Sequence, residues 1–235
     1  MLNYFSTSNI FNFIDILMKF LNSIFFVVLI IGLSFALVLS PPDYLQGENV
    51  RIMYIHVPAA WISLAAFSSI AFLSIINFVF KIKHTLLISK SIGPIGFLFT
   101  CLAIVSGALW GQPTWGTWWA WDARLTSMLV LSFFYLAFIF NFNIIKNDNL
   151  AIKVSSYISI LGAINIPIIK YSVDWWTTLH QPASIKLSGT TSIHSSMLTP
   201  LLLMLLVLLM YSALIFLMKY KTEIIKMKKK NLKKL

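Results

Sequence analysis

The sequence predicts an all-α membrane protein built as a single bundle of six transmembrane helices. Hydrophobic residues make up 59% of its 235 residues and charged residues only 11%, whereas about 25% of residues are charged in a typical soluble domain. Six stretches are apolar over the roughly 20 residues that a bilayer-spanning helix needs. Lysine and arginine gather between alternate stretches, which is typical of polytopic membrane proteins.

The six stretches define the expected spans. We place them at 21–40, 54–80, 92–109, 125–145, 154–171 and 197–218. The second is long enough to tilt in the bilayer, and the fifth contains Asn165 and Pro167. The first is too long for the apolar core of a signal peptide and lacks a small-residue cleavage pattern, so we expect it to be retained as a helix.

The distribution of positive charge predicts that both termini are cytoplasmic. This orientation places fourteen of the eighteen lysines and arginines inside and leaves Arg51, Arg124, Lys170 and Lys186 outside. The segments 41–53, 110–124 and 172–196 then face the periplasm or its equivalent. The basic tail, 219–235, carries eight of the inner positive residues, and we expect it to be attracted to anionic membrane lipid. No nucleic-acid-binding motif accompanies the tail, so nucleic acid is not an expected partner.

Several activities are disfavoured by what the chain lacks. Cys101 is the single cysteine, and without a CxxC or CxxCH motif neither a thiol oxidoreductase nor a c-type cytochrome is expected. No Walker A motif is present, so we do not expect the chain to hydrolyse ATP by itself.

The segment 110–126 is the most unusual part of the sequence. It contains five tryptophans within twelve residues: Trp110, Trp115, Trp118, Trp119 and Trp121. An aromatic belt at the membrane interface explains one or two tryptophans at a helix end but not this density. A dense indole platform favours a large, flat, apolar ligand such as a porphyrin, a quinone or a polycyclic lipid.

Glycine and proline also predict the local structure of this Trp-rich segment. We expect Gly111, Pro113 and Gly116 to break its first part into turns. From about Thr117 the chain is expected to form a short helix leading into the fourth span. Asp122 is expected to cap the start of that span.

Three of the four histidines fall on the outer side. His56 begins the second span, His180 follows the fifth and His194 precedes the sixth, whereas His84 lies in a lysine-rich inner loop and is expected to be solvated. Two neutral imidazoles binding from opposite faces would give six-coordinate haem iron. Zinc is the competing metal, but it prefers about four closely spaced ligands, which no HExxH or CxxC pattern supplies. The residues alone do not choose the pair of histidines.

Haem carries two propionates, and outer cations are natural partners for them. Arg51 and Arg124 are the candidates, with Lys170 behind them, because a guanidinium binds a carboxylate in a bidentate geometry. A local ion pair between Arg124 and Asp122 is the alternative role for Arg124.

At this point the residues resemble a known family. The run WGQPTWGTWWAWDARLT (110–126), together with YIHVPAA (54–60) and YSVDWWTTLHQ (171–181), resembles the WWD-domain proteins that handle haem in membranes. The length, the six spans and these three motifs are similar to the CcmC family of the system I cytochrome c maturation pathway, over nearly the whole chain.

This resemblance implies a function and a site. It implies that His56 and His180 are the axial ligands of haem iron and that Trp110, Trp115, Trp118, Trp119, Trp121, Asp122, Arg51 and Arg124 complete the binding site. It implies non-covalent haem b as the cargo, the haem chaperone CcmE as its receiver, and CcmD and the ABC transporter CcmAB as partners. His194 falls outside the matched motifs.

The resemblance also orders the possible functions. A haem-delivery protein that is not itself an enzyme is the leading interpretation. The alternatives are a haem lyase that attaches haem to apocytochrome c and a quinone-linked haem b electron-transfer protein. The expected location is the bacterial inner membrane, with the mitochondrial inner membrane as the alternative.

Overall fold

The computed structural model describes residues 7–181 and 193–232, and these residues form six long helices. They are α1 (Thr7–Ser34), α2 (Met53–Phe80), α3 (Lys83–Trp115), α4 (Ala123–Ile144), α5 (Asp148–Trp175) and α6 (Ser195–Leu232). All six are long and apolar enough to cross a membrane. The described residues contain no β-strand, so the predicted all-α bundle of six membrane-type helices is confirmed. Lys186, Lys233 and Lys234, which were used in the charge count, lie outside the described residues.

Two short helical segments complete the architecture. A π-helix, Phe35–Leu39, continues α1, and a 3-10 helix, Glu48–Ile52, leads into α2. Five of the six expected spans lie within one helix, apart from residue 145. The first runs through α1 and the π-helix and ends at Ser40, one residue beyond the π-helix. The helices extend further than the apolar stretches do. The largest extensions are at the start of α1 and at the end of α6, which continues through the basic tail as far as Leu232.

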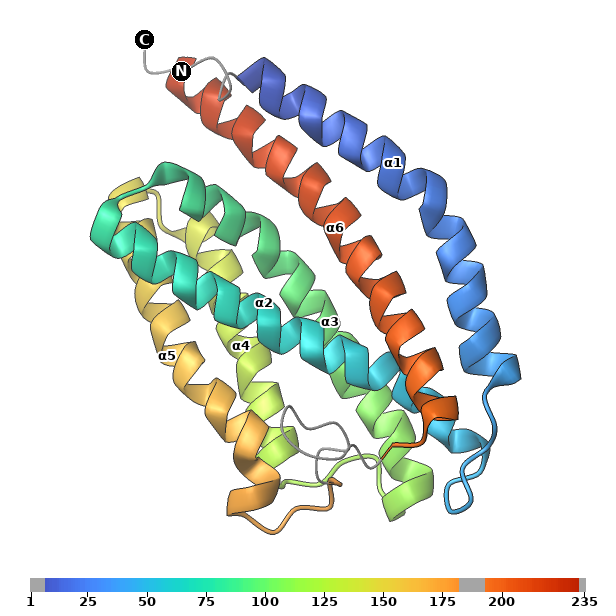
Figure 1. The fold of residues 1–235 in the computed structure, drawn as a ribbon. Helices are drawn as coiled ribbons and strands as arrows, with labels where there is room; N and C mark the ends of the chain where they lie inside the picture. Colours follow the sequence, from blue (N-terminus) through green and yellow to red (C-terminus); the bar gives the residue numbers. More distant parts are fainter. Residues whose placement is uncertain (1–6, 182–192, 233–235) are drawn as a thin grey trace.

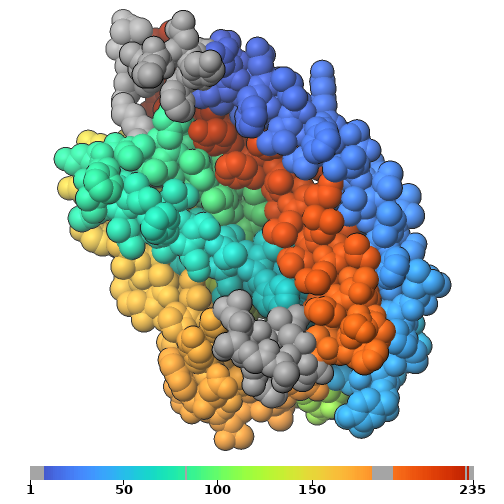
Figure 2. Space-filling model, in the orientation of Figure 1, coloured from blue at the N-terminus to red at the C-terminus, as the bar shows by residue number. Residues whose placement is uncertain are grey.

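The helices form two groups (Figure 1). Helices α2 to α5 pack together, and α1 lies along α6 on one side of them. In the space-filling view α6 separates α1 from α2 (Figure 2). Asp15 of α1 accepts hydrogen bonds from Lys221 Nζ at 2.6 and 2.8 Å, which fixes α1 to α6 near the end that carries the termini.

A close-packed core joins α2, α3, α4 and α5. Phe67, Phe99, Leu131 and Tyr135 are each at most 1% exposed. The Tyr135 hydroxyl donates a hydrogen bond to the Ser63 carbonyl at 2.6 Å, so the buried polar group is satisfied. This packing holds α2 against α3, the two helices that carry the first half of the site.

Loops at the two ends of the bundle differ in character. Short connections join α2 to α3 and α4 to α5 at the end where both termini lie (Figure 1). The opposite end carries the three longer connections, between α1 and α2, α3 and α4, and α5 and α6. We call it the tryptophan end, because the Trp-rich segment lies there.

Candidate functional site

His56 lies in the first turns of α2, at the tryptophan end, and its ring faces α3. Its Nδ1 atom lies 3.0 Å from the Ala103 carbonyl oxygen and 3.2 Å from Ser106 Oγ. Because a carbonyl only accepts hydrogen bonds, this contact assigns the proton to Nδ1. The Nε2 atom therefore carries the free lone pair, which is the arrangement typical of metal-binding histidines.

A glycine on α3 makes room for the His56 ring. A Cβ atom added at Gly107 would lie 2.9 Å from His56 Cε1, which is closer than two carbon atoms approach without displacement. Ala103 and Gly107 are four residues apart and therefore share a face of α3. This face of small residues lets the imidazole reach the backbone carbonyl of Ala103.

His180 approaches from the loop that follows α5, and its ring lies beside that of His56. The ring centroids are 6.3 Å apart and the ring planes meet at 35°. His180 Nδ1 lies 2.8 Å from the carbonyl oxygen of Gln181, so the same argument leaves its Nε2 unprotonated. The two histidines, which are 124 positions apart in the chain, thus form a pair with matching tautomers.

The surroundings of His180 favour its neutral form. Burial lowers the pKa of His180, and the positive charge of Arg124 lowers it further, although the Gln181 carbonyl and the charge of Asp122 act in the opposite direction. A neutral imidazole is the form that binds a metal ion.

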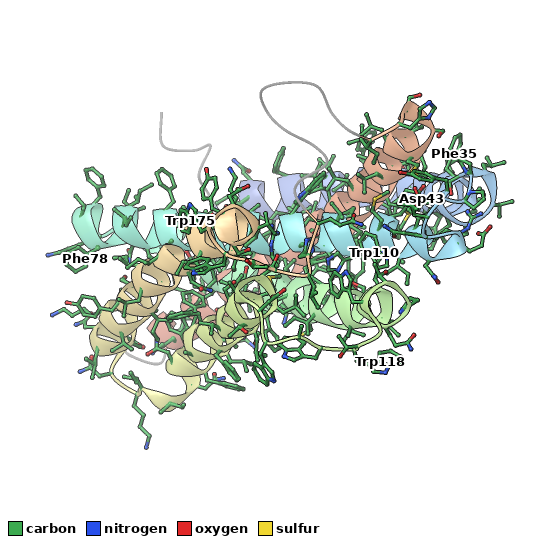
Figure 3. The ribbon with its side chains drawn as sticks, turned by 90° about the horizontal axis from the view of Figure 1, so that it is seen from below. Phe35, Asp43, Phe78, Trp110, Trp118 and Trp175 are labelled. Carbon is green, nitrogen blue, oxygen red and sulfur yellow. The ribbon has the colours of Figure 1, made fainter. Side chains whose placement is uncertain are left out.

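Two tryptophans flank the histidine pair. The Trp110 ring meets His56 edge-on at 5.7 Å between centroids, and the Trp115 ring lies 6.1 Å from His180. The Trp110 indole donates a hydrogen bond from Nε1 to Gln46 Oε1 at 2.8 Å, which fixes its orientation. In the view from below, Trp110 lies between Asp43 and Trp175 (Figure 3).

The expected turns in the first part of the Trp-rich segment were wrong. Helix α3 continues through Gly111 and Pro113 and ends only at Trp115. Pro113 lacks a backbone N–H, but the loss falls in the last turn. A Cβ atom at Gly111 would lie 2.9 Å from the Trp115 ring, so that ring packs closely on the helix. Gly116 then adopts a φ of 75° and ends the helix in the left-handed region.

The second part of the segment is irregular rather than helical, which also differs from the expectation. Residues 117–122 have no helical structure, and α4 begins at Ala123. The predicted cap is confirmed, because Asp122 Oδ1 accepts a hydrogen bond from the Leu125 N–H at 2.8 Å. The other oxygen, Oδ2, accepts from the Leu179 N–H at 3.2 Å. Asp122 therefore ties the start of α4 to the residue before His180.

The remaining tryptophans differ in exposure. Trp118 and Trp121 are 58% and 78% exposed, whereas Trp119 is partly buried with its ring against Trp121 at 5.6 Å. The Nε1 atom of Trp119 is buried and has no hydrogen-bond partner among the described residues. A buried donor without a partner is costly, so an acceptor from outside the described residues would stabilise this indole.

Arg124 carries a second buried donor of this kind. Its Nε atom has no hydrogen-bond partner among the described residues, and none of the four ion pairs found there involves it. Its charge interacts with Asp122 and Asp174 and with both His56 and His180. Arg124 is therefore a cation beside the histidine pair whose buried Nε atom has no acceptor in the described part of the chain.

Arg51, the other candidate cation, is engaged elsewhere. Its Nη1 atom donates to the Ala36 carbonyl at 3.1 Å and to Ser40 Oγ at 2.8 Å, and its Nε atom bonds to Glu48. It thus connects the end of the π-helix to the start of α2. Lys170 lies 5.3 Å from the centre of the Tyr171 ring.

The other two histidines lie in separate environments. His194 is exposed, its Nδ1 lies 2.8 Å from Ser196 Oγ, and its carbonyl accepts the Met197 and Leu198 N–H groups at the start of α6. His84 is exposed, as expected, and its Nδ1 lies 3.1 Å from the hydroxyl of Tyr220.

Sequence reasoning missed the residues that support the histidines. They are Gln46, Ala103, Ser106, Gly107 and the backbone of Leu179 and Gln181. The repeat of small residues at positions 103, 107 and 111, each four apart, was a usable signal for a close approach to α3. No pattern in the sequence indicates the hydrogen bonds made by Gln46, by the Leu179 N–H and by the Gln181 carbonyl.

Comparison with known proteins places these features in a family. A sequence model described as CcmC, Heme exporter protein C, matches residues 1–234. The chain is 41% identical over 204 residues to Heme exporter protein C of Escherichia coli, covering 87% of this chain and 82% of that protein. It is 40% identical over 206 residues to the protein of the same name from Bradyrhizobium diazoefficiens, covering 88% and 78%.

A plant relative is similar too. A putative cytochrome c biosynthesis ccmC-like mitochondrial protein of Marchantia polymorpha is 49% identical over 164 residues, covering 70% of this chain and 69% of that protein. The relatives therefore include both bacterial and mitochondrial proteins.

Proposed function

The chain belongs to the Heme exporter protein C (CcmC) family, which handles haem for cytochrome c biogenesis, and we propose that it holds haem between His56 and His180 and delivers it to the haem chaperone CcmE. Haem is the cargo rather than a resident cofactor. Its non-covalent binding through two imidazoles corresponds to haem b. In this proposal CcmE forms the covalent bond to haem through its own histidine, so the chain is a transport protein and not an enzyme.

The observation that carries this proposal is the histidine pair. Metal–imidazole bonds of about 2 Å on opposite faces of one ion place the two ring centres roughly 6 Å apart. The centroids of His56 and His180 are 6.3 Å apart, and the Nδ1 of each lies within hydrogen-bonding distance of a backbone carbonyl. Both Nε2 lone pairs are thus available, and the separation of the two ring centres suits one iron.

Charge and hydrogen bonding support a position for the propionates. The buried Nε atom of Arg124 and the buried Nε1 atom of Trp119 are donors without partners among the described residues. Propionate oxygens are acceptors, and a bond to an ionised group is about twice as strong as a neutral one. We therefore assign propionate binding to Arg124 and Trp119. Arg51 would have to give up Glu48 and the Ala36 carbonyl to take part.

The remaining indoles support the macrocycle and leave it accessible. Trp110 and Trp115 lie against the two histidines and supply flat apolar surface beside the porphyrin. Trp118 and Trp121 are exposed at the same end, where a receiving protein can approach. Asp122 positions the loop that carries His180 and does not bind haem itself, because its two oxygens accept backbone N–H groups.

The proposal also assigns a side of the membrane and partners. The charge distribution of the chain supports an outer, periplasmic position for the tryptophan end and cytoplasmic termini. CcmD and CcmAB are the further partners, and the bacterial inner membrane is the proposed location, with the mitochondrial inner membrane as the alternative. The basic end of α6 would lie against anionic lipid on the inner side.

Co-expression tests delivery directly. The chain, CcmD and CcmE are produced together without any apocytochrome, and covalent haem on CcmE is measured. Haem-loaded CcmE is the expected result, and His56→Ala combined with His180→Ala abolishes it. In a second arm an apocytochrome c is added; if haem is then found attached only to the apocytochrome and never to CcmE, the chain is a haem lyase. If wild-type protein holds haem yet never loads CcmE, the delivery role is wrong.

A further inference from the structure

A small pocket at the tryptophan end lies next to the histidine pair but outside it. Its volume is about 250 Å³, and its walls are Leu45, Gln46, Asn49, Pro113, Thr114 and Gln181. They come from the connection before α2, the last turn of α3 and the start of the loop after α5. We call it the amide pocket, because three of these six side chains are carboxamides.

The chemistry of the amide pocket argues against haem as its occupant. None of the six wall residues is charged or aromatic, whereas haem has two carboxylates and a large apolar ring. A lipid phosphate would call for lysine or arginine, and the walls contain neither.

The same chemistry suits a peptide backbone. A carboxamide both donates and accepts hydrogen bonds, so Gln46, Asn49 and Gln181 can pair with the N–H and C=O groups of an extended segment. Thr114 adds a hydroxyl, and Leu45 and Pro113 supply apolar surface for a small side chain.

A rigid turn beside the pocket presents two apolar side chains to solvent. Asp43 Oδ1 accepts the N–H groups of Leu45 and Gln46 at 2.9 and 2.8 Å, and Asp43 and Gly47 exchange backbone hydrogen bonds at 3.1 and 2.9 Å. Tyr44 and Leu45, at the tip of this turn, are 91% and 78% exposed. Since the turn is already ordered, binding through these side chains costs little conformational entropy.

The walls of the pocket also contact both halves of the histidine pair. The Gln181 carbonyl oxygen lies 2.8 Å from His180 Nδ1. Gln46 Oε1 accepts from the Trp110 indole at 2.8 Å, and that indole lies against His56. A segment bound in the amide pocket therefore touches the residues that orient each imidazole.

We infer that the amide pocket and the Tyr44–Leu45 turn form the docking site for an extended, uncharged segment of the protein that receives the haem. This inference rests on the proposed delivery function and adds a second contact surface to it, separate from the exposed indoles. Docking here places the receiving segment beside the haem edge and in contact with the supports of both ligands.

Photo-crosslinking tests where the receiver binds. p-Benzoylphenylalanine is introduced at position 44 in place of Tyr44, in the haem-loaded protein together with CcmE. The matched control carries it in place of Tyr171, which is 41% exposed near the tryptophan end of α5. We expect a crosslink to CcmE from position 44 and little or none from position 171. Crosslinks of equal yield from both positions, or none from position 44, overturn the inference.

Substitutions in the wall of the amide pocket test whether docking there promotes transfer of haem to CcmE. Asn49→Leu combined with Leu45→Ala removes a hydrogen-bonding group and apolar surface from the wall. It leaves Gln46, Gln181 and Thr114 in place, and Thr114 matters to the haem site because its hydroxyl donates to the Trp110 carbonyl at 2.7 Å. The control is Gln112→Leu, next to the wall residue Pro113. We expect the double variant to bind haem with an unchanged visible spectrum and to load CcmE about tenfold more slowly, with the control at the wild-type rate.

The outcomes separate this inference from the proposed function. Wild-type loading of CcmE by the double variant overturns the docking site while leaving delivery intact. Loss of the haem spectrum in the double variant also overturns it, because the pocket then belongs to the haem site. Wild-type protein that never loads CcmE overturns the delivery function itself, and the docking inference with it.

Discussion

The carboxylate of Asp122 accepts the backbone N–H of Leu179 at 3.2 Å while its other oxygen caps α4 through Leu125 at 2.8 Å. Leu179 directly precedes His180, so one side chain connects the Trp-rich segment to the loop that supplies the second histidine. We conclude that the position of His180 depends on Asp122 as well as on the bond between its own ring and Gln181.

Asp122→Asn separates the two roles of this carboxylate. Asparagine caps helices about as well as aspartate, but its amide nitrogen cannot accept the Leu179 N–H. We expect α4 to stay intact and haem affinity to fall roughly threefold to tenfold, the range for one lost hydrogen bond of this type. Haem titration measures the affinity and thermal unfolding measures the stability.

The control for Asp122→Asn is Asp174→Asn, which removes another carboxylate charge that interacts with Arg124. It should leave haem affinity close to wild type. If both substitutions weaken haem binding equally, the effect comes from the lost charge. The proposed role of the hydrogen bond between Asp122 and the Leu179 N–H is then wrong.

Gly107→Ala tests the close approach of His56 to α3. The new methyl group would lie 2.9 Å from His56 Cε1, so the ring must move and its contact with the Ala103 carbonyl lengthens. We expect roughly tenfold weaker haem binding, because small displacements of a ligand group are costly. Gly93→Ala on the same helix, where the methyl group would meet Phe138 at 3.1 Å, should bind haem normally. The reverse order of affinities would count against this account of His56.

Trp119→Phe tests the assignment of a propionate to a buried indole. Loss of a hydrogen bond to a charged acceptor should weaken haem binding about tenfold. Trp121→Phe, at an exposed position, should have little effect. The dimethyl ester of haem lacks the charge, so with it wild type and Trp119→Phe should differ much less. An equal difference with both ligands would show that Trp119 acts through packing instead.

The pKa of His180 gives a prediction with a definite sign. Because burial lowers this pKa, the folded protein keeps His180 neutral at pH 7 and takes up a proton only below the ordinary histidine value of about 6.5. Haem binding through His180 should therefore be complete at neutral pH and be lost in acid. The stabilisation of the folded state from this group is likewise present at neutral pH and lost as pH falls through the lowered pKa.

Two substitutions should shift this pKa in opposite directions. Arg124→Gln removes a positive charge and should raise the pKa of His180, whereas Asp122→Asn removes a negative charge and should lower it. The measurement is an NMR titration of carbon-labelled histidine in the haem-free protein, with the His180 signal assigned from its absence in His180→Gln. Shifts of the same sign in both variants would contradict the electrostatic account.

The fold could be predicted from the sequence because lipid imposes a strong constraint. Each helix must satisfy its own backbone in an apolar solvent, so long apolar stretches identify the helices. The helix ends were harder to predict. Pro113 indicates a break, yet α3 passes through it, since the packing of Trp115 on Gly111 outweighs the local preference of one proline near a helix end.

The site could be predicted only in part. The Trp-rich segment and the cap at Asp122 are local patterns, and the sequence shows both. The choice of His56 and His180 over His194 came from the family resemblance of their motifs. Its physical basis is how α2 and the loop after α5 meet, and that cannot be derived from the residues alone. Arg51 looked like a free outer cation, but its guanidinium bonds to the end of the π-helix, a contact between segments whose register the sequence leaves open.

The ligation of haem iron by His56 and His180 is the central claim, and the spectra of purified single variants test it most directly. Visible and electron paramagnetic resonance spectra of wild type, His56→Gly and His180→Gly are recorded with and without added imidazole, and His194→Gly is the control. We predict low-spin bis-histidine haem in wild type and in the control, a high-spin signal in each of the other two variants, and recovery of the low-spin signal with imidazole. An unchanged low-spin spectrum in either His56→Gly or His180→Gly would contradict the account.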